Sequence, residues 1–93
     1  MPGLAALGAE DVKIEEISEP IRVLADCAGG RMTPVRFRWS GRTVVVDSVN
    51  GRWIDRDGEG YALHFSIQAG DETYYLHFAG SDVQWWLDRV VMD

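Results

Sequence analysis

The feature that most constrains the fold is a pair of alternating apolar segments on either side of Gly70-Asp71. Glycine at the first position of a two-residue loop is typical of a type II′ turn, so the segments are predicted to pair as an antiparallel hairpin. A slip of one residue would place apolar side chains opposite polar ones, so the register is well specified. The expected apolar pairs are Leu63 with Phe78, Phe65 with Leu76, and Ile67 with Tyr74.

A second hairpin is predicted around Ser40-Gly41. Residues 34–39 alternate strictly, with Val35, Phe37 and Trp39 on one face and two arginines on the other. Pairing across the turn sets Phe37 opposite Val44, which is also apolar. The partner strand is expected to continue through Val49, with a break or bulge at Asn50-Gly51.

Further strands are expected at residues 21–25 and 83–91, and a polar loop at residues 55–60. Along residues 83–91, Trp85 and Leu87 share one face, and Trp86 and Val90 share the other. Adjacent strand residues point to opposite faces, so only one of the two indoles can enter the core. The other needs a cover, such as the N-terminal segment, a second subunit or another protein.

These segments predict a mostly β fold, a small antiparallel barrel or strongly curled sheet of five to six strands. Tight turns join the strands, and a flat sheet of this size would leave one face and two edges exposed. Residues 20–93 are expected to form one domain, since two would each be too short to bury a core. Residues 1–19 are expected to be an acidic, partly mobile segment with a short irregular or helical structure.

Composition narrows the setting of this domain. The chain of 93 residues has a net charge of −6, concentrated before Pro20, which argues against a general polyanion binder. The single Cys27 cannot close an intramolecular disulfide, so we expect a reducing, cytoplasmic protein. No signal peptide and no apolar run long enough for a membrane span is recognised, so no membrane partner is expected.

His64 and His77 fall opposite each other in the predicted hairpin, on the face away from the core. Directly opposed strand residues have Cβ atoms about 4.5–5.5 Å apart, which could allow a shared metal ion. A metal site needs a third and usually a fourth ligand, and the neighbours Ser66 and Tyr75 are poor zinc ligands. The two histidines are therefore only weak metal candidates beside their interpretation as surface imidazoles. We expect no catalytic residues and no cofactor.

The candidate binding surface consists of Arg36, Arg38, Tyr75 and Trp86, which all point away from the predicted core. Arginine and aromatic side chains are enriched where proteins bind each other, and also where barrels bind single-stranded nucleic acid. A purely structural alternative is that Asp47 and Asp88 pair with the arginines while Trp86 packs under a terminal segment.

A set of short motifs from Pro20 onward points to a known family. They are Pro20-Ile21-Arg22-Val23, Phe37-x-Trp39-x-Gly41 followed by Val46, Val49 and Trp53, Tyr75-Leu76, and Trp85-Trp86-Leu87-x-Arg89-Val90. In these motifs the chain resembles a small bacterial domain of unknown function associated with Y-family, translesion-type DNA polymerase-like proteins, appended to them or standing alone. The resemblance implies a context in DNA-damage tolerance and an accessory or contact role, with no active-site residue.

The residues and the resemblance together predict a non-enzymatic β module that binds another protein, with a polymerase-like partner or a homodimer among the options. The alternative function is binding of single-stranded nucleic acid through the same arginine and aromatic surface. A metal-dependent enzyme using His64 and His77 would need ligands that the sequence does not reveal.

Overall fold

The computed structural model describes residues 12–92, without the side chain of Asp57, and expectations for residues 1–11 and 93 lie outside that range. Within it the chain forms seven strands. They are β1 (Lys13–Ala28), β2 (Arg31–Trp39), β3 (Arg42–Val45), β4 (Ser48–Asp57), β5 (Gly60–Ala69), β6 (Glu72–Ala79) and β7 (Gln84–Met92).

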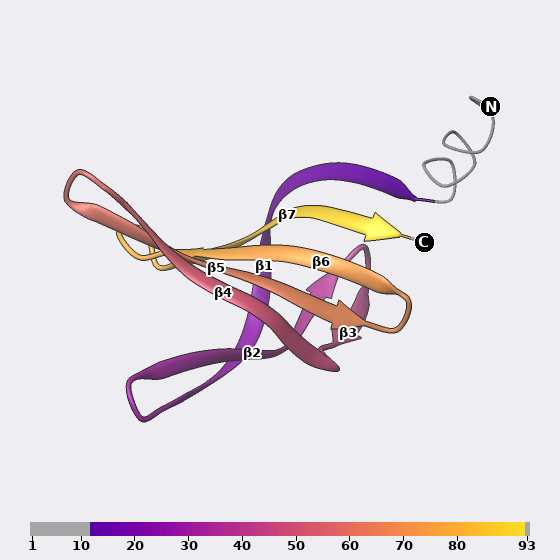
Figure 1. The fold of residues 1–93 in the computed structure, drawn as a ribbon, viewed down its shortest axis with the longest axis horizontal. Coiled ribbons are helices and arrows are strands. Elements are labelled where there is room, and N and C mark those ends of the chain that lie inside the picture. Colours follow the sequence, from indigo (N-terminus) through magenta and orange to yellow (C-terminus); the bar gives the residue numbers. More distant parts are fainter. Residues whose placement is uncertain (1–11, 93) are drawn as a thin grey trace, which may run out of the picture.

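All seven strands belong to one antiparallel sheet with the order β3-β2-β1-β7-β6-β5-β4. The sheet curls into a half-barrel, and the long β1 bends so that its first half lies beside β7 and its second half beside β2 (Figure 1). The predicted antiparallel, strongly curled sheet is therefore confirmed. The predicted count of five to six strands is too low.

The seventh strand comes from the division of one predicted strand, and the first strand is longer than predicted. Residues 13–19, expected to be irregular or helical, are part of β1 and pair with β7, from Lys13 opposite Met92 to Glu19 opposite Leu87. The strand predicted to run through Val49 is divided at Val46-Asp47, where the chain crosses from one edge of the sheet to the other. The backbone nitrogens of these two residues donate to Val35 and Gln68 at 2.9 and 2.8 Å, which brings the edges together.

Both predicted hairpin registers are confirmed. Leu63 pairs with Phe78, Phe65 with Leu76 and Ile67 with Tyr74 across Gly70-Asp71, and Phe37 pairs with Val44 across Ser40-Gly41. Gly41 and Gly70 have φ angles of 75° and 61°, in the left-handed region that glycine adopts without strain. The predicted loop at residues 55–60 is instead the tip of a hairpin, because β4 continues to Asp57 and only residues 58–59 form the turn.

The sheet has four register shifts among residues 12–92. One lies in β1 between Glu16 and Glu19, and the other three are β-bulges that change which side chains face the core. The predicted irregularity at Asn50 is confirmed as a register shift between Val49 and Gly51. In β2, Leu24 pairs with Arg36 and Ala25 with Pro34, so Val35 is left over; it is exposed and Pro34 is buried in its place. Placing Val35 on the face of Phe37 was therefore wrong. Proline has no backbone N–H to donate to the sheet, and within strands it is tolerated at bulges.

The third bulge lies in β7, where Tyr75 pairs with Arg89 and Leu76 with Leu87, leaving Asp88 without a partner. The extra residue lets Leu87 and Val90 both enter the core, each with no exposed surface. The expectation that Val90 faces outward with Trp86 was therefore wrong.

The core fills the concave face of the half-barrel. Trp85 is buried in it, whereas Trp86 lies half-buried on the opposite face, which we call the outer face. The buried apolar residues are Ile21, Phe37, Val44, Phe65, Ile67, Ala69, Tyr74, Leu76, Trp85, Leu87 and Val90. No helix among residues 12–92 has the length and apolar character needed to cross a membrane.

Candidate functional site

Four side chains form a row of stacked rings across the outer face. Trp53 on β4, His64 on β5, His77 on β6 and Trp86 on β7 occupy consecutive opposed positions in the sheet. The Trp53 and His64 rings have centroids 5.2 Å apart and an interplanar angle of 6°, and the two histidine rings are also 5.2 Å apart. His77 stacks on Trp86 at 6.3 Å and 10°. The stack places the two imidazoles face to face, between the two indoles.

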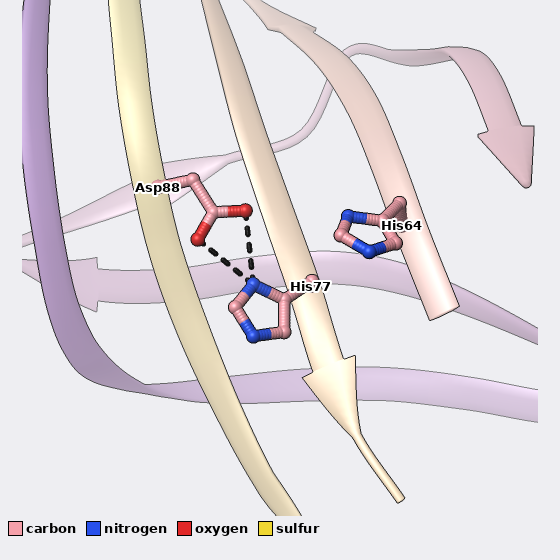
Figure 2. A group of neighbouring side chains, drawn as sticks. All are labelled: His64, His77 and Asp88. Atoms are coloured by element: carbon pink, nitrogen blue, oxygen red, sulfur yellow. Dashed lines mark hydrogen bonds and ion pairs between the residues drawn. The ribbon is translucent and has the colours of Figure 1, made fainter. Parts of the chain in front are cut away.

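Asp88 adds a carboxylate to this row. Its Oδ1 and Oδ2 lie 2.8 and 2.9 Å from Nδ1 of His77 (Figure 2). The side chains are half-buried, with exposed fractions of 24% for His77 and 27% for Asp88, so solvent screens the contact only in part. Because Asp88 is the extra residue of the β7 bulge, the bulge turns its side chain toward β6.

A shallow hollow of about 290 Å³ opens next to these side chains. Its polar lining comes from Asp55, His64, Asp88 and Arg89, and aromatic rings form part of its wall. Arg89 is engaged elsewhere: its guanidinium lies 5.6 Å from the Tyr75 ring centroid, and its Nε is 3.3 Å from Glu16. The hollow therefore presents imidazole and carboxylate groups, the side chains that bind metals and polar ligands.

A second outer-face feature lies on the other arm of the sheet, formed by β1, β2 and β3. Arg22 on β1 is directly opposite Arg38 on β2, and Arg36 is opposite Leu24. These residues line a shallow groove of about 290 Å³. Among the side chains of residues 12–92, leaving out Asp57, no carboxylate forms an ion pair with Arg22, Arg36 or Arg38. We call these three residues the arginine face.

Like charges placed directly opposite each other destabilise a strand pair. Arg22 and Arg38 are such a pair. Arg38 donates from Nη1 to Oγ1 of Thr43 on β3 at 3.0 Å, which directs its guanidinium to the side away from β1. Leu24 and Val45 are exposed beside them, with 49% and 59% of their surface accessible. The arginine face is therefore both basic and partly apolar.

The four residues expected to form one binding surface fall into two groups. Arg36 and Arg38 lie on β2, Tyr75 on β6 and Trp86 on β7, and β1 lies between β2 and β7. Tyr75 and Trp86 both have partners within the domain, since Arg89 lies over the Tyr75 ring and His77 stacks on Trp86. Arg36 and Arg38 make no cation–π contact with a ring among residues 12–92.

The alternative in which Asp47 and Asp88 pair with the arginines is wrong, because both carboxylates have other partners. Oδ2 of Asp47 accepts a hydrogen bond from the backbone nitrogen of Gly70 at 2.8 Å, and Asp88 contacts His77. Both aspartates are thus occupied away from the arginine face. The predicted opposition of His64 and His77 is confirmed.

Sequence reasoning missed three residues of these sites: Arg22, Trp53 and Asp88. A signal for Asp88 was present, since Arg89 interrupts the apolar alternation of the last strand and a bulge is one cause of such an interruption. The neighbours of Arg22 and Trp53 are set by the β1–β2 and β4–β5 registers. Each of these registers contains a bulge.

Comparison of the chain with protein-family models, with curated proteins and with solved structures finds no match.

Proposed function

We propose that this protein is a non-enzymatic β module that binds an acidic segment of another protein through the arginine face. The observation that supports this proposal is that Arg22 and Arg38 occupy directly opposed positions on β1 and β2. Neither forms an ion pair with a carboxylate among the described side chains of residues 12–92. An anionic partner would offset the like charges that the register places opposite each other. Arginine also makes planar, two-point contacts with carboxylates.

The apolar surface beside the arginines favours a protein partner over a nucleic acid. Leu24 and Val45 are exposed next to Arg36 and suit an acidic segment that also carries apolar side chains. Nucleic-acid binding modules instead combine basic groups with free aromatic faces on which bases stack. His64 and His77 each have aromatic neighbours on both sides, which leaves little ring surface for a base.

The resemblance to domains associated with translesion-type polymerases supports a partner in DNA-damage tolerance. We propose that such a polymerase-like protein, or an associated factor, supplies the acidic segment. Tyr75 and Trp86 stay candidates for a second contact region of the same partner, because Trp86 retains accessible surface on the outer face.

The proposal can be tested with defined probes. A labelled peptide rich in Glu and Leu is titrated with the protein and followed by fluorescence anisotropy, in parallel with a labelled single-stranded oligonucleotide. We expect the peptide to bind saturably at low salt and to bind more weakly as salt rises, because surface charge contacts are screened. The double variant Arg36→Ala, Arg38→Ala should lose this binding.

A matched control is the double variant Lys13→Ala, Arg56→Ala, which removes the same charge from exposed positions outside the arginine face. It should bind the peptide as the unchanged protein does. Equal losses in both double variants would show only a general charge effect and contradict the proposal. Binding of the oligonucleotide but not of the peptide would favour the nucleic-acid alternative, and binding of neither would reject both functions.

A further inference from the structure

The outer face carries a second set of side chains that the proposed function does not use. His64, His77 and Asp88 lie side by side on three adjacent strands, and the His77 ring points to Asp88 (Figure 2). One ligand-type atom of each residue lies within 4.8 Å of those of the other two. The sequence offered two imidazoles and no third ligand, and the β7 bulge supplies the missing carboxylate.

The geometry points to a binding site for one divalent transition-metal ion of the zinc type, with His64, His77 and Asp88 as its protein ligands. Zinc binds imidazole nitrogen and carboxylate oxygen at about 2.0–2.2 Å, so its ligand atoms lie roughly 3–3.5 Å apart. The Asp88 oxygens and Nδ1 of His77, at 2.8 and 2.9 Å, need to separate only slightly as the metal replaces the proton between them. His64 must approach by a side-chain movement on the order of 1 Å and turn out of the stack, because an imidazole nitrogen binds a metal in the plane of its ring.

The surroundings of the three ligands favour such a site. Trp53 and Trp86 lie on the outer sides of the two imidazoles and limit the directions in which the rings can turn. The neighbouring hollow of about 290 Å³ has room for the water molecules that complete a three-ligand site, and Asp55 lines it with a further carboxylate. Arg89, the nearby cation, is paired with Glu16 and lies over Tyr75.

The test uses the full chain without a tag and two metals, Zn²⁺ and Co²⁺. Binding of Zn²⁺ is measured by calorimetry, and Co²⁺ is followed by its visible absorption and by quenching of tryptophan fluorescence. We expect one ion per chain, displacement of Co²⁺ by Zn²⁺, and quenching, since two tryptophans flank the ligands. Loss of an outer hydrogen-bond partner alone weakens metal sites by about 10- to 100-fold, so removal of a ligand should weaken binding about 100-fold or more.

Two variants remove a ligand by different routes. Asp88→Asn removes the carboxylate charge, and His64→Phe removes the nitrogen ligand while keeping an aromatic ring in the stack, so a folding defect in one variant does not end the test. Asp82→Asn, in an exposed turn, is the matched control and should bind as the unchanged protein does. Cys27→Ser is included because Cys27 is an exposed free thiol.

Weak binding in both ligand variants, with normal binding in the Asp82 and Cys27 variants, supports the site. Its independence from the arginine face is tested with Arg36→Ala, Arg38→Ala, which should bind metal unchanged whether or not it binds the acidic peptide. The proposal is overturned if the unchanged protein shows no saturable binding of either metal. It is equally overturned if Asp88→Asn and His64→Phe bind normally, or if Cys27→Ser alone abolishes binding.

Discussion

The phenol ring of Tyr74 meets the ring of Phe37 edge-on, with centroids 5.2 Å apart and an interplanar angle of 73°. Tyr74 lies on β6 and Phe37 on β2, and two strands separate them in the sheet, so the contact spans the concave face of the half-barrel. Trp39 approaches the same tyrosine at 6.1 Å. These rings join the arm formed by β1 to β3 to the arm formed by β4 to β7.

Removing the Phe37 ring should therefore destabilise the whole domain. Phe37 is 1% exposed, and truncation of such a buried aromatic costs about 3–5 kcal/mol. We expect Phe37→Ala to lower the free energy of unfolding by that amount in urea denaturation, whereas Phe37→Leu should cost less. Equal stability of Phe37→Ala and the unchanged protein would show that the two arms are held together by other contacts.

Tyr74 also predicts a stability change at alkaline pH. Burial of the phenol raises the pKa of Tyr74 above its ordinary value of 10.0, and the hydrogen bond from its hydroxyl to Oε1 of Glu72, at 3.0 Å, adds to the rise. The folded protein therefore keeps a proton that the unfolded chain loses above pH 10.0, so stability is retained below this pH and falls as the pH rises past it.

The measurement is urea denaturation at a series of alkaline pH values for the unchanged protein and Tyr74→Phe. The slope of the free energy of unfolding against pH should be smaller in Tyr74→Phe, because the other chain titrations are shared. Tyr75→Phe is the matched control, since it removes a phenol hydroxyl from the outer face of the same strand and leaves the buried phenol of Tyr74 in place. Identical slopes in all three proteins would contradict the assigned shift.

The hairpins could be predicted from the sequence because their information is local. The alternation around Gly70-Asp71 fixes both the turn and the register of β5 and β6, and it also sets His64 opposite His77. The strand count could not be obtained in this way. The division at Val46-Asp47 depends on Gln68, a residue more than twenty positions away, and alternation within a strand carries no sign of a crossing between sheet edges.

The bulges account for most of what was missed in the sites. Counting outward from Gly29-Gly30 without a bulge would set Arg22 opposite Phe37, and the bulge at Val35 moves it opposite Arg38. The arginine face thus depends on one inserted residue. Asp88 was likewise misplaced because of a bulge. It is the single extra residue of the β7 bulge, and it contacts His77 instead of pairing with an arginine as the sequence had indicated.

Arg52 connects the two sides of the half-barrel at its open end. From β4, its Nη1 donates to the backbone oxygen of Met32 at 3.0 Å, and its guanidinium lies 5.6 Å from the centroid of the Phe65 ring. One hydrogen bond and one cation–π contact together suggest a contribution of about 1–2 kcal/mol. Arg52→Met keeps an unbranched stem without the guanidinium, and should lower the free energy of unfolding by that amount.

Arg56→Met on the same strand is the comparison, because this exposed side chain should change stability by less than about 0.5 kcal/mol. Hydrogen exchange distinguishes the mechanism. Loss of Arg52 should speed exchange at the amides of β4, an edge strand, more than at those of β6. Equal effects of the two substitutions on stability would show that Arg52 does not hold the open end closed.

Because Arg22 and Arg38 are directly opposed, one substitution at Arg22 is expected to raise the stability of the domain and to weaken its binding of the acidic peptide. In Arg22→Glu an opposite charge faces Arg38, and cross-strand pairs of opposite charge contribute about 0.2–1 kcal/mol. The variant should therefore be more stable than the unchanged protein in urea denaturation, and the gain should shrink as salt is added. It should also bind the acidic peptide more weakly, because a carboxylate already occupies the arginine face.

Arg22→Gln is the control that removes the repulsion without adding an attraction, and its stability should lie between those of Arg22→Glu and the unchanged protein. A loss of stability in both variants would mean that the arginine has a structural role in the native sheet. Unchanged peptide binding in Arg22→Glu would place the binding surface elsewhere, while the stability gain would still stand. The two measurements therefore test the strand pairing and the proposed partner surface independently.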